Sequence, residues 1–275
     1  MTTWELFLNV THADRVVLAL DLDGTLTRQG TVPSDAASAA ARELASAGVM
    51  VVLATGRQLH DCTAVVEALD LKETWLVASD GAVMARYEGT TQAMLATRTF
   101  DPRPLALALS ELDPAISVGA EDVGAGYFVT SRVTWMSKYG HRQRVVDELP
   151  QSVTMFTAAS TVLSGAELAG VAASLGLSHT GWDEDGWGYL DAAAPGLSKA
   201  SGVAALVQTA APSSTFTVAV GDFHNDIALL NWANVGIAMG HAPPEVVAAA
   251  DHLAGTIDED GIVDVLQELL AALRR

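Results

Sequence analysis

VVLALDLDG, residues 16–24, is the most informative segment of this chain. Its first part, Val16 to Leu20, is continuously apolar and begins with β-branched side chains, a pattern typical of a strand buried on both faces, as in a parallel sheet. Asp21 and Asp23 follow directly, and Gly24 allows the backbone to turn sharply. Because ligands of open α/β sheets bind outside the carboxyl ends of the strands, the segment predicts both a fold class and the place of a site.

The sequence that follows alternates helices and strands. A helix capped by Ser34 and ended by Gly48 precedes a buried strand at 50–54, and a helix at 58–69 leads to a third strand at 75–78. This β-α-β-α-β order has short connections, which require right-handed crossovers and a parallel sheet with helices on its faces. We therefore expect an α/β fold.

The same order returns after residue 199, so the two ends of the chain are expected to build one core. We predict a doubly wound, Rossmann-like parallel sheet from residues 1–83 and 189–275, interrupted by an inserted α+β domain, residues 84–188. Within the insertion, the sequence predicts an alternating strand at 127–135 and helices at 103–112, 140–149 and 165–175.

Composition excludes several classes of protein. Half of the 275 residues are hydrophobic and 17% are charged, which rules out low-hydrophobicity disorder. The net charge of −18 disfavours nucleic acid and anionic membrane surfaces as partners. The single cysteine, Cys62, cannot form an intramolecular disulfide, which fits a cytoplasmic protein. No apolar run approaches the ~20 residues that span a bilayer, and no signal peptide is apparent.

Polar groups end each of the predicted core strands, and Lys199 begins the helix that leads into the fourth. These groups are Asp21 and Asp23, Thr55 and Gly56, Ser79 to Gly81, and Asp222 with Asn225 and Asp226. Carboxylates so close together are costly unless a cation lies between them or one is protonated. Oxygen ligands without a His/Cys set favour Mg²⁺ over zinc, and an Asp carboxylate can act as a nucleophile while a second one supplies a proton.

Four motifs, in chain order, resemble those of the haloacid dehalogenase superfamily: DLDGTL (21–26), ATGR (54–57), GLSK (196–199) and GDFHND (221–226). More narrowly, the chain resembles the Cof-type sugar-phosphate phosphatases, which carry a large cap between motifs two and three. The segments that carry this second resemblance are SDGA (79–82), YLDAAAPGLSK (189–199), GIAMGHA (236–242) and AAAD (248–251). The cap matches in position and length far more than in sequence.

The resemblance implies roles for the residues of these motifs. Asp21 would be the nucleophile and a Mg²⁺ ligand, and Asp23 the general acid and base, whose carbonyl also binds the metal. Asp222 would be the third protein ligand, with Asp226 in support. The implied phosphate-binding residues are Thr55, Gly56, Lys199 and Asn225.

Two positions depart from the family pattern. Asp80 stands where Cof-type proteins usually have asparagine, which adds a carboxylate near the phosphate pocket. His224 stands in the loop after Asp222, where asparagine or glycine is common. Both leave the substrate preference open.

The insertion contains a basic stretch that lacks Asp and Glu, residues 123–146. Its cationic side chains either form a solvated face or attract an anionic substrate. The candidate substrate-recognition residues are Arg132, Lys138 and Arg142.

The sequence thus predicts a cytoplasmic Mg²⁺-dependent phosphatase that hydrolyses small phosphorylated metabolites, sugar phosphates above all, through an aspartyl-phosphate intermediate. Two alternatives stay open: a phosphosugar mutase of the same superfamily, and a non-catalytic sugar-phosphate sensor, which loss of Asp21 or Asp23 would have favoured. Neither nucleic acid nor a membrane is an expected partner, and the oligomeric state stays open.

Overall fold

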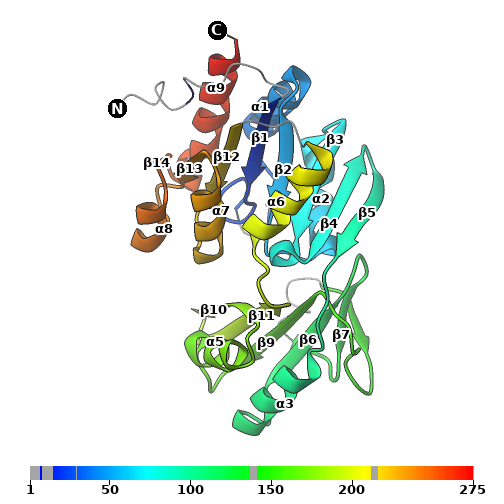
Figure 1. The fold of residues 1–275 in the computed structure, drawn as a ribbon. Helices are drawn as coiled ribbons and strands as arrows, with labels where there is room; N and C mark the ends of the chain where they lie inside the picture. The colour runs from blue at the N-terminus through cyan, green and yellow to red at the C-terminus, as the bar shows by residue number, and fades with distance from the viewer. Residues whose placement is uncertain are drawn as a thin grey trace. The chain divides into compact units, whose positions relative to one another are not determined.

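The computed structural model describes residues 7, 15–28, 30–134, 136, 141–211 and 216–274. They form two compact units, each with a sheet of its own (Figure 1). The first unit falls within residues 1–56, 62–95 and 198–275, and the second within residues 57–61 and 96–197. The limits predicted from the sequence, at residues 84 and 188, stay a prediction.

The first unit contains, in its described part, an eight-stranded sheet in the order β14-β13-β12-β1-β2-β3-β4-β5. The strands are β1 (Val16–Leu20), β2 (Met50–Ala54), β3 (Glu73–Ala78), β4 (Val83–Glu88), β5 (Thr91–Thr97), β12 (Phe216–Gly221), β13 (Val235–Ala238) and β14 (His252–Leu253). The helices are α1 (Asp35–Ala47), α2 (Thr63–Leu69), α6 (Lys199–Ala210), α7 (Ile227–Trp232), α8 (Pro244–Ala249) and α9 (Gly261–Leu273). Neighbouring strands are parallel from β14 to β3, and β4 is antiparallel to β3.

Strand β1 lies at the centre of this sheet, between β12 and β2, and all five of its residues are buried. Helix α1 begins where the sequence predicts, because the Ser34 side chain accepts a hydrogen bond from the Ala37 backbone N–H. It ends at Gly48, which has a φ of 106°, a left-handed conformation that residues with a side chain rarely adopt. Helix α1 packs against α9, and α6 packs against α7 over one face of the sheet (Figure 1). The predicted doubly wound parallel sheet is confirmed.

The parallel strands end at one edge of the sheet, and the candidate site residues follow them there. Asp21 follows β1, Thr55 follows β2, and Asp222 follows β12. Because β1 pairs in parallel with both β2 and β12, the carboxyl ends of these three strands lie side by side.

The second unit contains, among its described residues, a six-stranded sheet in the order β10-β11-β9-β6-β7-β8. The strands are β6 (Ser117–Asp122), β7 (Gly126–Val129), β8 (Gln143–Val145), β9 (Met155–Ser160), β10 (Ser178–Glu184) and β11 (Trp187–Ala193), and the helices are α3 (Arg103–Leu112) and α5 (Gly165–Ser174). The core between helices and sheet contains Leu105 and Leu109 of α3, Phe156 of β9 and Leu168 of α5. This unit is an α+β arrangement, as predicted.

Two local predictions within the second unit are wrong. The stretch predicted as a helix at 140–149 contains β8, which pairs in parallel with β7. The strand predicted at 127–135 ends at Val129, after which the chain bends. In both places the sheet neighbours, rather than local propensity, decide the conformation. No helix of the described residues is long and apolar enough to cross a membrane.

Candidate active site

The side chain of Lys199 joins two carboxylates at the carboxyl edge of the first sheet. Its ammonium donates hydrogen bonds to Asp21 Oδ1 over 2.7 Å and to Asp226 Oδ1 over 2.8 Å. All three side chains are almost fully buried. Lys199 is the first residue of α6, whose start is stabilised by a capping box between Ser198 and Ser201. This N-terminal helix cap therefore helps to fix the backbone position of Lys199.

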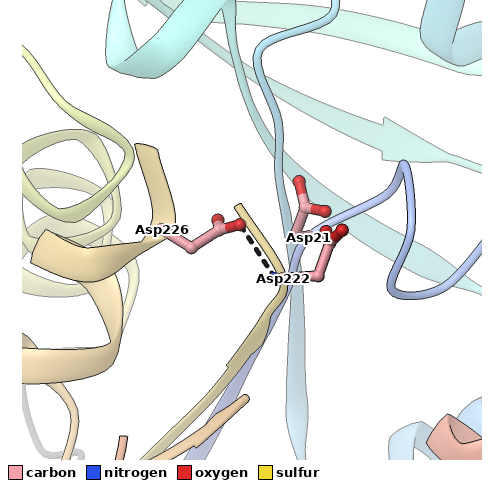
Figure 2. Close-up of side chains that lie close together, drawn as sticks. All are labelled: Asp21, Asp222 and Asp226. Atoms are coloured by element: carbon pink, nitrogen blue, oxygen red, sulfur yellow. Dashed lines mark hydrogen bonds between the residues drawn. The ribbon is translucent and has the colours of Figure 1, made fainter. Parts of the chain in front are cut away.

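Asp226 connects this ion pair to the end of β12. Its second oxygen, Oδ2, accepts hydrogen bonds from the backbone N–H groups of Asp222 (3.1 Å) and Phe223 (3.0 Å). Figure 2 shows the carboxylates of Asp21, Asp222 and Asp226 gathered at the ends of β1 and β12. One oxygen from each lies within 4.8 Å of the others, which makes the three a candidate metal-ligand set.

Asp222 lies against the turn that follows β1. Its Oδ1 accepts from Thr25 Oγ1 over 3.3 Å, and its Oδ2 lies 3.4 Å from Nε2 of His241. Gly24 has a φ of 88°, and a Cβ placed there would lie 2.1 Å from Asp222 Oδ2. Glycine at position 24 is therefore required both by the backbone and by the neighbouring carboxylate.

Asn225 joins the lysine to a fourth carboxylate, that of Asp80. The amide oxygen of Asn225 lies 3.2 Å from Lys199 Nζ, and its Nδ2 donates to Asp80 Oδ1 over 2.9 Å. The Asp80 backbone N–H donates to the carbonyl of Thr55 over 3.1 Å. A Cβ at Gly56 would lie 3.4 Å from both the Asn225 amide nitrogen and Asp80 Oδ1, so the second and fourth motifs lie against each other here.

Asp23 is half-buried in the turn after β1, where it forms an isolated bridge with Thr27. Its side chain is not one of the three carboxylates that form the candidate metal-ligand set. The metal contact implied for Asp23 runs through its carbonyl oxygen and the acid role through its side chain, and both stay predictions.

The charges of this cluster do not balance. Among its described side chains, the carboxylates of Asp21, Asp80, Asp222 and Asp226 gather around the single ammonium of Lys199. Burial lowers the pKa of Lys199, but the charges of Asp21, Asp226 and Asp80 outweigh it and raise that pKa above its usual range. Lys199 therefore stays charged.

The pKa values of carboxyls in this cluster are raised as well, but for a carboxyl this favours the neutral form. Burial raises the pKa of Asp21 well above its usual range, and the charges of Asp226 and Asp222 raise it further, against the effect of Lys199. Burial also raises the pKa values of Asp80 and Asp222. Buried oxygen donors with excess negative charge fit a hard divalent cation, because such a cation would relieve their repulsion. The donor set thus fits Mg²⁺.

The predicted recognition residues lie in the second unit. Arg132 and Arg142 are exposed there, whereas Lys138 lies outside the described residues. Arg144, of the same basic stretch, pairs with Asp122 and stacks over the ring of Phe128 at 4.9 Å. His224, in the first unit, is exposed and contacts the Phe223 ring edge-on.

Sequence reasoning missed two neighbours of Asp222, namely Thr25 and His241. The signal was present, since Thr25 belongs to DLDGTL and His241 to GIAMGHA. The sequence does not show that His241 lies beside Asp222, because it is the parallel pairing of β12 with β13 that brings the two together.

Comparison with known proteins finds a family model and full-length relatives that match this chain. A family model described as haloacid dehalogenase-like hydrolase matches residues 18–114 and 169–266. The chain is 25% identical over 269 residues to the 5-amino-6-(5-phospho-D-ribitylamino)uracil phosphatase YbjI of Escherichia coli (strain K12), covering 92% of this chain and 96% of that one. It is 26% identical over 275 residues to the pyridoxal phosphate phosphatase YbhA of the same organism, covering 91% and 97%.

A solved structure shows the same fold. The haloacid dehalogenase-like hydrolase from B. subtilis superposes with a TM-score of 0.76 at 21% identity, covering 92% of this chain and 99% of that chain.

Proposed function

Since the chain belongs to the haloacid dehalogenase-like hydrolases and is a phosphatase of that family, we propose that it hydrolyses small phosphorylated metabolites with Mg²⁺, through an aspartyl-phosphate intermediate. The observation that carries this proposal is the contact between Lys199 and Asp21 inside a buried, carboxylate-rich cluster. A buried nucleophilic carboxylate must be ionised to attack phosphorus, and the adjacent ammonium favours that form.

In the first step, an oxygen of Asp21 attacks phosphorus while the bond between phosphorus and the leaving oxygen breaks. Asp23 gives its proton to the leaving oxygen, which departs as an alcohol. In the second step, water attacks phosphorus, Asp23 takes up the proton of that water, and the bond to Asp21 breaks to release inorganic phosphate. Each carboxyl then has its starting protonation state.

The remaining groups bind and balance charge. The Lys199 ammonium, the Thr55 hydroxyl, the Gly56 backbone and the Asn225 amide would hold the phosphoryl oxygens. When bound, Mg²⁺ would supply positive charge to offset the charge of the transferring phosphoryl group. Asp21 and Asp222 would hold it with their carboxylates and Asp23 with its carbonyl. Asp226, whose two oxygens already accept from Lys199 and from backbone N–H groups, would support the site.

The proposal also concerns the choice of substrate. The two relatives named above act, by their names, on a ribitylaminouracil phosphate and on pyridoxal phosphate, each a phosphate ester of a small metabolite. The resemblance of the motifs to Cof-type proteins favours sugar phosphates. We propose residues 84–188 as the specificity domain, with Arg132, Lys138 and Arg142 as its anion-attracting groups. A cytoplasmic location, suggested by the single cysteine, belongs to the same proposal.

The test is a panel of phosphorylated metabolites with Mg²⁺, in which released inorganic phosphate is measured. The panel contains sugar phosphates, pyridoxal phosphate and a ribitylaminouracil phosphate, and Asp21→Ala serves as the inactive control. Release from members of the panel by the wild type alone supports the proposal. Transfer without release, activated by a sugar bisphosphate, would instead identify a mutase, and binding without either reaction would identify a sensor.

A further inference from the structure

Asn225 lies between one group that accepts its hydrogen bond and one that can only donate. Its Nδ2 donates to Asp80 Oδ1 over 2.9 Å, and its Oδ1 faces Lys199 Nζ at 3.2 Å. An ammonium has no lone pair to accept with, and a carboxyl oxygen accepts in either protonation state. The Asn225 amide therefore satisfies both neighbours in one orientation. In the flipped orientation its NH₂ group would face the ammonium, and the contact would be repulsive.

Asp80 is held from a second direction by its own backbone. The turn Ser79-Asp80-Gly81 has positive φ angles throughout, of 53°, 49° and 99°. Aspartate tolerates this left-handed region better than most residues, and the Asp80 N–H donates to the Thr55 carbonyl over 3.1 Å. The carboxylate of Asp80 is thus a fixed acceptor beside Gly56, toward which the amide of Asn225 is oriented.

We propose that Asp80 is a positioning residue, which orients the Asn225 amide and through it holds the Lys199 ammonium against Asp21. The chain of contacts runs from Asp80 through Asn225 to Lys199 and from there to Asp21, with distances of 2.9, 3.2 and 2.7 Å. Asparagine at position 80 could turn either amide atom toward Asn225, whereas a carboxylate offers an acceptor. The inference concerns the site of the proposed function and rests on it for its kinetic test.

The kinetic test exchanges donor and acceptor between positions 80 and 225. Asp80→Ala is expected to lower kcat/KM by about 10- to 100-fold, the scale of one lost hydrogen bond to a charged group. Asn225→Asp places two carboxylates face to face and is expected to cost about 100-fold or more. The charge-conserving exchange Asp80→Asn with Asn225→Asp reverses the hydrogen bond, and it should recover about tenfold or more of that loss.

A second double variant distinguishes an effect of hydrogen-bond orientation at position 225 from simple repulsion between two carboxylates. Asp80→Ala with Asn225→Asp removes the charge at position 80 without supplying a donor. If this variant recovers as much activity as the exchange variant, repulsion explains the effect and the proposal is overturned. Failure of the exchange variant to exceed Asn225→Asp alone, with native circular dichroism, also overturns it.

A spectroscopic readout is independent of activity. The Asn225 side-chain NH₂ signals in a ¹⁵N–¹H spectrum are identified by their loss in Asn225→Asp. In Asp80→Ala these signals should shift and exchange with water about tenfold faster or more, because their acceptor is gone. Unchanged signals would overturn the proposal. A wild type that hydrolyses no phosphate ester would overturn the proposed function alone.

Asp251 provides the matched control. Its carboxylate accepts from the Gly236 backbone N–H over 2.8 Å, at the start of β13, in the same unit as Asp80. Asp251→Ala is expected to leave both kcat/KM and the Asn225 signals as in the wild type. A change equal to that of Asp80→Ala would show that loss of any such carboxylate disturbs the unit, and it would overturn the proposal.

Discussion

Lys199 donates a 2.7 Å hydrogen bond to Asp21, a residue 178 positions away in the sequence. The contact joins the first turn of α6 to the end of β1, and it brings the motif that contains the proposed nucleophile together with the motif that contains the buried lysine. The same ammonium also bonds Asp226, so one lysine balances part of the charge of two buried carboxylates.

Asp21→Asn is expected to lower kcat by about three orders of magnitude or more, because it removes the attacking carboxylate. The measurement is steady-state release of phosphate, with saturating Mg²⁺ and with the metal chelated. Wild-type turnover should also disappear on chelation and return with Mg²⁺. Turnover close to that of the wild type in a correctly folded Asp21→Asn variant would disprove the aspartyl-phosphate mechanism.

Asp23→Asn is expected to slow substrates with poor leaving groups more than activated aryl phosphates. A leaving group of low pKa needs no proton from the enzyme, and general acid catalysis contributes ~10²–10⁴-fold. The measurement compares kcat for an alkyl phosphate and for an aryl phosphate in the same variant. Equal losses on both would remove Asp23 from the acid role.

Lys199→Met is expected to lower both activity and stability. Loss of one partner of a buried charge pair costs roughly 3–5 kcal/mol, because Asp21 and Asp226 are left facing each other without the ammonium. Urea unfolding with the metal chelated measures this cost, and Mg²⁺ should reduce it. Lys72→Met is the matched control, since Lys72 is exposed and a surface change there should stay within about 0.5 kcal/mol. A Lys199→Met variant as stable as the control would contradict the charge balance described for the cluster.

Arg132→Ala is expected to raise KM for the preferred phosphate ester, and the increase should be larger at low ionic strength. The reason is that Arg132 is exposed, and salt screens the attraction between an exposed cation and an anion. A generic aryl phosphate should be affected less. The measurement is KM at two salt concentrations for Arg132→Ala, Lys138→Ala and Arg142→Ala. If none of the three changes KM, recognition depends on other residues of the insertion.

Much of the fold was predictable because it depends on local information. Strand β1 is continuously apolar, α1 begins at a serine cap, and it ends at a glycine with positive φ. Apolar runs and caps act between residues close in sequence, and the parallel order of the core strands follows from their short helical connections. The helix predicted at 140–149 is wrong because this segment depends on non-local contacts: β8 forms through its pairing with β7 rather than through its own propensity.

The amino-acid order alone already determined which residue types stand at the ends of the core strands, because those positions are read directly after each apolar run. The contacts among them depend on the packed fold. Asp80 and Asn225, 145 positions apart, meet because β3 and β12 end at one edge of the sheet. Leu59, in the second unit, donates its N–H to the buried carboxylate of Glu121 over 3.1 Å. No periodicity encodes such a pair, since a hydrogen bond between distant residues forms only after the sheets have brought their backbones together.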